Sequence, residues 1–198
     1  MFALVQDGNI VQMPKGNKGI TIDGNQYPAS IYTLWTDAER LAIGIYPVRI
    51  DTTNKKDEAW YINTNITYAV SGNEVVGTYG TATAKAIADA NATDEDGVEL
   101  DPVVVIKGLK TIKKEMIDNQ CANILADSDW MVVKATETGG TMDSGWKTWR
   151  ASVRTKCNSM QTQIDNASDF DALAALFTYT EQEDGSVTRP LGEFPIKE

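Results

Sequence analysis

The side chains that could carry covalent or metal chemistry are few in this sequence. The 198 residues include no histidine and two cysteines, Cys121 and Cys157. Without histidine, the chain alone cannot form a Ser-His-Asp triad, a Cys-His pair or a His-ligated metal site. Two cysteines are too few for a four-thiolate zinc site, and both fall within helical patterns. We therefore expect two free, buried thiols rather than a redox pair.

Carboxylates are the other candidates for chemistry. The acidic run Asp94-Glu95-Asp96-Gly97 lacks the spacing of a calcium loop and is typical of a solvated turn. The sequence also lacks the nucleophile-elbow, Walker, dinucleotide-binding and C-x-x-C motifs. We expect no catalytic residue, no metal and no cofactor. Because a glycosidase needs only two carboxyl groups, a carboxylate-dependent glycan-degrading enzyme stays open as an alternative.

Aromatic and basic residues near position 150 are the strongest candidates for a binding surface. Trp146 and Trp149 are three residues apart and share one face of a predicted helix, and Arg150 and Arg154 flank the apolar stripe of that helix. Aromatic side chains bury a large area with few rotatable bonds, so such a cluster is either core or an anchor at an interface. From the sequence, both interpretations stay open.

Composition and charge narrow the class of protein. A hydrophobic content of 42% and a charged content of 23% are typical of globular proteins, and the length suits one domain or two small ones. The net charge of −10 argues against binding along nucleic acid. Residues 103–156 carry nine Lys/Arg against six Asp/Glu, so this region is basic within an acidic chain. Its basic side chains are either solvated or docked against an acidic partner or against the acidic remainder of the chain.

Targeting signals are absent from the sequence. The apolar run Met1–Val5 is short and has no basic start, so it does not resemble a signal peptide. No stretch approaches the ~18 consecutive apolar residues that a membrane span needs. We therefore expect a cytoplasmic protein that does not enter a membrane.

The first 80 residues predict a β-rich domain. Three turns of similar chemistry, at residues 7–9, 23–25 and 71–73, lie between short apolar runs and predict hairpins. Thr36 and Glu39 have the spacing of a helix-capping box. A strand should follow at residues 45–50, and Pro47 predicts that this strand lies at a sheet edge, because proline cannot donate to a ladder.

The second half predicts helices. Residues 81–101 read as a linker, partly helical at 83–90, followed by a helical domain at 102–180 and a tail at 181–198. The helical period begins at Val103. The first helix has a stripe formed by Val105, Leu109, Ile112 and Met116, and a shifted stripe continues with Ile117, Cys121 and Ile124. The second begins near Asp143-Ser144, and a short third helix follows Ser168-Asp169. The stripe of the second helix consists of Trp146, Trp149, Val153, Cys157, Met160 and Ile164. We therefore predict an α+β protein with a β-rich N-terminal half and a C-terminal helical hairpin. A two-helix unit has little core of its own, so its remaining apolar stripe must be buried against the β part, a second copy or another protein.

Two segments of the helical half carry a family resemblance. The segment Leu125–Ala135, followed by a Thr/Gly loop and then Trp146–Arg154, resembles the C-terminal region of bacteriophage tail-fibre assembly proteins and related phage tail proteins. Those proteins typically have a lysine-rich helix, a "TDWMVxRAxE" segment and an aromatic-x-x-Tyr-Arg-x-x-x-Arg helix. Thr36–Ile45 and Asp57–Tyr61 are similar to further segments of such proteins.

The resemblance implies a function without enzymatic activity. Proteins of this type bind tail fibres, assist formation of the fibre trimer, and in some phages stay on the particle as a fibre or baseplate adaptor. It therefore implies a tail-fibre partner, with baseplate proteins or a second copy as further partners, and a location in the host cytoplasm during assembly or in the virion tail. A homo-oligomeric structural module is the remaining alternative. Trp130 is expected to hold the helices together. The residues expected to bind a partner are Trp146, Trp149, Arg150, Val153, Arg154 and Met160.

Overall fold

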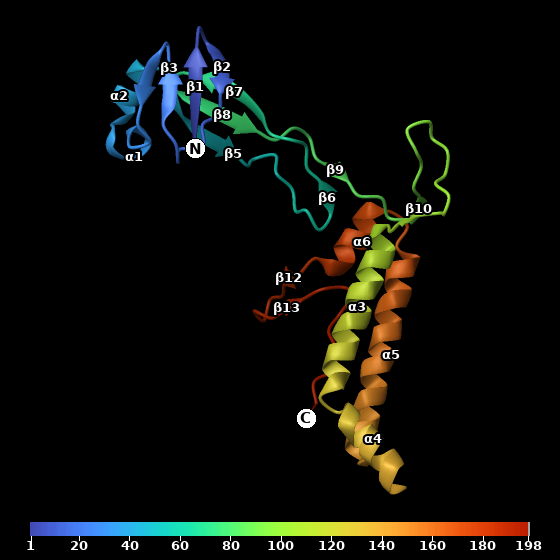
Figure 1. Ribbon diagram of the computed structural model, residues 1–198. Helices are drawn as coiled ribbons and strands as arrows, with labels where there is room; N and C mark the ends of the chain where they lie inside the picture. Colours follow the sequence, from blue (N-terminus) through green and yellow to red (C-terminus); the bar gives the residue numbers. More distant parts are fainter. Residues whose placement is uncertain (198) are drawn as a thin grey trace. The chain divides into compact units, whose positions relative to one another are not determined.

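The protein has an α+β fold in which strands and helices are segregated along the chain (Figure 1). The computed structural model describes residues 1–197, and the chain divides into two compact units, residues 1–83 and residues 84–198. Strands and hairpins dominate the first unit, and helices dominate the second. The predicted fold class is therefore confirmed.

The first unit is built on a five-stranded sheet with the strand order β2-β1-β5-β8-β7. Adjacent strands are antiparallel except β5 and β8, which are parallel. The strands are β1 (Phe2–Gln6), β2 (Asn9–Gln12), β5 (Ile45–Asp51), β7 (Thr67–Ser71) and β8 (Glu74–Thr78). Asp7 and Gly8 both have positive φ, as the tight turn between β1 and β2 requires. The three predicted hairpins are confirmed, the remaining one being β3 (Ile20–Ile22) with β4 (Asn25–Tyr27).

The prediction that the strand containing Pro47 lies at a sheet edge is wrong. That strand, β5, is the middle strand of the sheet. It pairs with β1 through Ile45–Pro47 and with β8 only from Val48 onward. Pro47 therefore lies where β5 changes partner, and the amide of Val48 donates the hydrogen bond to the Met1 carbonyl. A proline is tolerated at this position because no second ladder runs along it.

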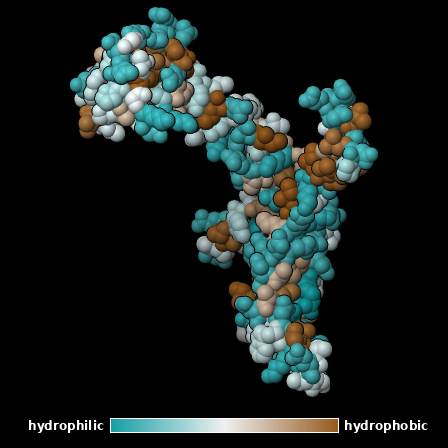
Figure 2. Space-filling view, in the orientation of Figure 1, coloured by the Kyte–Doolittle hydropathy of each residue, from teal (hydrophilic) through white to brown (hydrophobic). Residues whose placement is uncertain are grey.

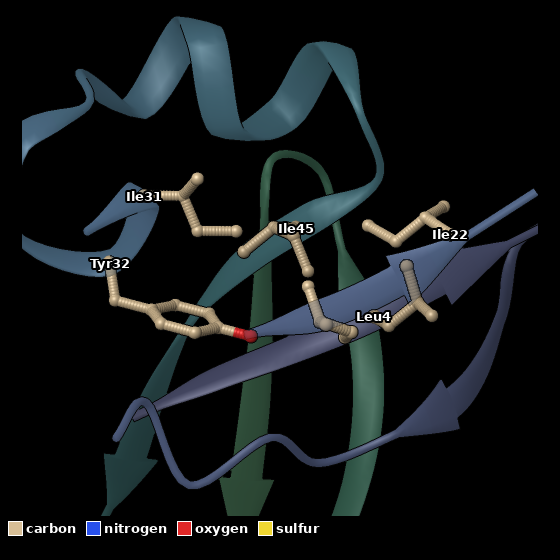
Figure 3. Close-up of a cluster of buried hydrophobic side chains, with 6 residues drawn as sticks. Leu4, Ile22, Ile31, Tyr32 and Ile45 are labelled. Atoms are coloured by element: carbon tan, nitrogen blue, oxygen red, sulfur yellow. The ribbon is translucent and has the colours of Figure 1, made fainter. Parts of the chain in front are cut away.

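Apolar side chains gather on both faces of the sheet. Leu4 and Ile45 contact side chains from β3 and from α1 (Ile31–Leu34) on one face, and Figure 3 shows these residues pointing toward one another. Ala3, Val5 and Val75 form a second cluster, as expected from the alternation of side chains along β1.

A short helix, α2 (Asp37–Ala42), begins where the capping box predicts. The Thr36 hydroxyl accepts from the Glu39 amide, and the Glu39 carboxylate accepts from the Thr36 amide at 2.8 Å. Residues 83–90, predicted as partly helical, contain strand ends instead. There β9 (Thr83–Ala84) pairs with β6 (Tyr61–Ile62), and β10 (Ala90–Asn91) follows.

The second unit is organised around two long antiparallel helices (Figure 1). Lys114 Nζ lies 2.8 Å from Asp165 Oδ1 near one end of the pair, and Arg150 contacts Leu125 near the other. The elements of this unit are β10, β11 (Val105–Ile106), α3 (Leu109–Ala126), α4 (Asp129–Thr138), α5 (Ser144–Asn166), α6 (Phe170–Phe177), β12 (Thr180–Glu181) and β13 (Val187–Thr188). No helix within residues 1–197 combines the length and apolarity needed to cross a membrane.

The face that α3 buries agrees in part with the predicted stripes: Leu109, Ile117 and Cys121 are buried, whereas Ile112, Met116 and Ile124 are not. The helix begins at Leu109 rather than near Val103, because Val105–Ile106 forms a strand. Its buried positions are four residues apart, and the second of them is Lys113, whose ammonium lies over the Phe177 ring at 5.2 Å. The aliphatic part of a lysine side chain can pack against apolar surface while its ammonium group stays solvated. A pattern of apolar residue types therefore does not identify a lysine as a buried position. The buried positions are Leu109, Lys113, Ile117 and Cys121.

Candidate functional site

Arg150 joins the end of α3 to the start of α4. Its side chain is buried, with 7% of its surface exposed. Nη1 donates to the Leu125 carbonyl at 2.8 Å and to the Ser128 hydroxyl, and Nη2 donates to Asp129 Oδ1 at 2.6 Å. The Leu125 carbonyl, in the last turn of α3, also accepts from the Ser128 amide at 3.1 Å and from the Ser128 hydroxyl at 2.9 Å. Arg150 therefore adds a charged donor to a carbonyl that already has partners, and it fixes the corner from which α4 begins.

Two other predicted binding residues lie inside the helical pair. Val153 and Met160 have no exposed surface. They belong to the face of α5 that also contains Cys157 and Ile164, and α3 packs against α5. The structure thus places both residues in the core of the unit.

The two predicted tryptophans contact the C-terminal segment. Trp146 and Trp149 pack edge to face, with ring centroids 5.5 Å apart. Trp149 Nε1 donates to the Pro195 carbonyl at 3.0 Å, and Lys197 Nζ lies 5.4 Å from the centre of the Trp146 ring. Both rings are half-buried by these contacts. They hold the C-terminal segment against the start of α5.

Helix α4 presents an apolar surface, and none of its residues was among the predicted binding residues. It buries none of its residues, although it contains four consecutive apolar side chains. Trp130 is 57% exposed, Val133 is 53% exposed and Val132 is 41% exposed. A helix that is apolar on several faces is ordinarily buried by neighbours. The run Trp130-Met131-Val132-Val133 was the available signal, and it marks a helix that lacks a cover.

Grooves lie on two sides of α4. One has a volume of about 420 Å³, and Val132, Met142, Lys147 and Arg154 contribute to its walls. The other has a volume of about 340 Å³ and is lined in part by Trp130, Lys134 and Trp146. The first groove combines aliphatic walls with cationic side chains, so it suits a peptide that presents carboxylates next to aliphatic residues. We call α4 and the start of α5 the tip of the helical unit. Of the predicted site residues, Arg150 and Arg154 line the first groove, where Arg150 is buried and Arg154 is exposed, and Trp146 lines the second.

The two thiols lie in the helical core. Cys121 and Cys157 are free and buried, as predicted. Burial, together with a hydrogen bond to Cys121, raises the pKa of the Cys157 thiol to about 12. A thiol held protonated in this way is a poor nucleophile. Both cysteines contribute to the packing of the helical core.

The acidic run forms a turn. Asp94 Oδ1 accepts hydrogen bonds from the amides of Asp96 and Val98 at 3.0 and 2.9 Å. Across residues 1–197, no three Asp, Glu, Cys or His side chains gather closely enough to hold a metal ion.

Comparison with protein-family models, with curated proteins and with solved structures finds no match to this chain.

Proposed function

We propose that this chain is a bacteriophage tail-fibre-associated protein that docks on the fibre through the tip of its helical unit. The observation that carries the proposal is α4, a helix with a run of apolar side chains and no buried residue. Hydrophobic surface of this kind is stabilised when a partner removes it from water. Trp130 and Val133, on the outer surface of α4, are the expected anchors, because aromatic side chains dominate binding energy at interfaces.

The geometry also gives a physical reason for the two motif segments. The DWM segment and the WRxxxR segment are separated by a Thr/Gly loop in the sequence. In the structure, Asp129 of the first segment accepts from Arg150 of the second. Residues of both motif segments therefore fix the start of α4, and the outer face of α4 remains exposed. This arrangement fits a docking element held in a fixed orientation, which lowers the entropic cost of binding.

Two modes of action use the same surface. A chaperone would bind the fibre subunits during assembly in the host cytoplasm and leave the product. An adaptor would stay in the virion tail and join the fibre to the baseplate. Mass spectrometry of purified virions separates them, since only an adaptor is present in near-stoichiometric amount. The resemblance implies a trimeric fibre, and up to three copies per fibre follow from that expectation.

The test compares the tip with a surface of equal exposure elsewhere in the same unit. Trp130→Ala combined with Val133→Asp should abolish capture of the fibre protein encoded by the same phage. Val187→Asp is the matched control, because Val187 is 57% exposed and lies in β13. All three proteins should have the same circular dichroism spectrum. Unchanged fibre binding by the tip variant would refute the proposed site, and absence of binding by the natural chain would refute the proposed partner.

A further inference from the structure

A segment at the other end of the helical unit projects from it without a cover. We call residues 90–106 the arm. Strands β10 and β11 form its base, the Ala92 amide donates to the Val104 carbonyl at 2.8 Å, and Thr93 and Glu99 form a bridge near its end. Gly97, with positive φ, closes the turn. The arm is therefore an ordered two-stranded structure.

The arm exposes apolar side chains at a density unusual for a surface segment. Figure 2 shows a brown group of atoms where the arm leaves the helices. Each of the apolar residues involved is between 37% and 61% exposed. Contiguous apolar surface of this kind marks an interaction site. The residues are Val98, Leu100, Val103, Val104, Val105 and Ile106.

The charge of the arm limits what can cover these residues. The arm contains five carboxylates and no Lys or Arg. None of the ion pairs formed by the described residues involves them. Two arms paired side by side would place these like charges together, which is destabilising. A complementary partner must offer cations beside an apolar surface. The carboxylates belong to Asp94, Glu95, Asp96, Glu99 and Asp101.

Such a surface exists on the same chain at the opposite end of α3 and α5. The groove of about 420 Å³ between α4 and α5 has Val132 and Met142 in its walls and the cations Lys147 and Arg154 at its sides. Neither cationic side chain has a hydrogen-bond or ion-pair partner among residues 1–197. Charge and apolar character therefore match between the arm and this groove.

The arm cannot reach the groove of its own copy. Its base is fixed to the start of α3, because the Gly108 amide donates to Asp89 Oδ1 at 2.7 Å and the Leu109 amide donates to the Ala86 carbonyl at 2.9 Å. The groove lies beyond the other end of α3, which at 18 residues is about 27 Å long. Figure 1 shows the arm and α4 at opposite ends of the helical pair.

We propose that the arm of one copy binds in the α4–α5 groove of a second copy, head to tail. Val103 and Val105 would face the aliphatic wall, and Glu99 and Asp101 would approach Lys147 and Arg154. An arrangement of this kind uses two different surfaces on each copy, so it produces a closed ring or a growing chain rather than a two-fold dimer. It leaves the outer face of α4 available and is independent of the fibre.

Mixing two variants, each of which lacks one of the two proposed binding surfaces, tests this geometry. The arm variant is Val103→Asp with Val105→Asp, and the groove variant is Lys147→Glu with Arg154→Glu. By sedimentation velocity, the natural chain should self-associate over a concentration series. Each variant alone should stay monomeric or associate at least about tenfold more weakly, because each lacks one of the two surfaces. An equimolar mixture should form a 1:1 dimer that grows no further, since it contains one intact arm and one intact groove.

The control variant changes charge outside both proposed surfaces. Lys15→Glu with Lys18→Glu makes the same charge change in the first unit and should leave self-association unchanged. A monomeric natural chain at every concentration, or a mixture that stays monomeric, would overturn the proposal. So would loss of fibre capture by the arm variant with self-association intact, because that result would assign the arm to the fibre. Failure of fibre binding through Trp130 and Val133 leaves this experiment unaffected.

Discussion

Asp129 Oδ1 accepts a hydrogen bond of 2.6 Å from Arg150 Nη2, and this contact joins the first residue of α4 to a buried side chain near the start of α5. The same guanidinium reaches the Leu125 carbonyl and the Ser128 hydroxyl. One buried cation thus donates to a backbone carbonyl, a hydroxyl and a carboxylate within a single turn of chain. From sequence spacing, a partner contact and a structural role for Arg150 were equally open, and these contacts show the structural role directly.

Replacing Arg150 should loosen the tip more than the rest of the unit. Arg150→Met keeps much of the apolar stem but leaves the Leu125 carbonyl and the Ser128 hydroxyl without this donor. We expect the free energy of unfolding to fall by about 2–3 kcal/mol, because hydrogen bonds from a charged group are involved. Asp129→Asn removes one charge at an exposed partner and should cost about 1 kcal/mol. Chemical denaturation measures the loss of stability in both variants. In Arg150→Met, amide hydrogen exchange should increase first in α4. Equal losses of stability in the two variants would contradict the central role of Arg150.

The seam between α3 and α5 should be sensitive to charge. Val153→Asp combined with Met160→Asp places two carboxylates at positions with no exposed surface. Burial of an unpaired carboxylate is costly enough that the helical unit should lose its structure. Thr155→Asp combined with Ser159→Asp, at exposed positions of the same helix, is the matched control and should fold. A native circular dichroism spectrum for the Val153/Met160 variant would place these residues at an interface instead.

The sequence predicted the elements better than it predicted their surroundings. Turn residues and caps act locally, so the hairpin at Asp7-Gly8 and the capping box at Thr36 were readable from short patterns. The position of β5 depends on which strands flank Pro47, and that information lies far away in the sequence.

The candidate site shows the same limit. Trp146, Trp149 and Arg154 were identified from helical spacing, and the structure places Trp146 and Arg154 beside grooves at the tip. Spacing could not show that Trp149 donates to the Pro195 carbonyl, because that contact joins residues 46 positions apart. Nor could it show that α4 stays uncovered, since an apolar run usually indicates burial.

The indole of Trp149 should anchor the C-terminal segment. Trp149→Phe keeps an aromatic ring against Trp146 but removes the donor to the Pro195 carbonyl. We expect a loss of about 1 kcal/mol, the usual net value of one hydrogen bond. Limited proteolysis should cut residues 189–197 faster in this variant than in the control variant Trp130→Phe. Trp130 suits the control because its ring is exposed on α4. Equal cleavage of the two variants would show that the segment is held by other contacts.

The buried thiol should make stability fall at high pH. Burial raises the pKa of Cys157 from its ordinary value of 9.0 to about 12 in the folded chain. Below pH 9 the thiol is protonated in both states, so it contributes no slope. Between about pH 9 and 12 the unfolded chain releases the proton while the folded chain retains it, and the free energy of unfolding therefore falls as pH rises. Cys157→Ala should show a shallower decline over this range, because the other titrating groups remain and cancel in the comparison. Parallel curves for the two proteins would mean that the thiol has the same pKa in both states.

Reaction with a thiol reagent gives a second readout: it should be slow at pH 8 in the folded chain and fast after denaturation, since only the thiolate reacts.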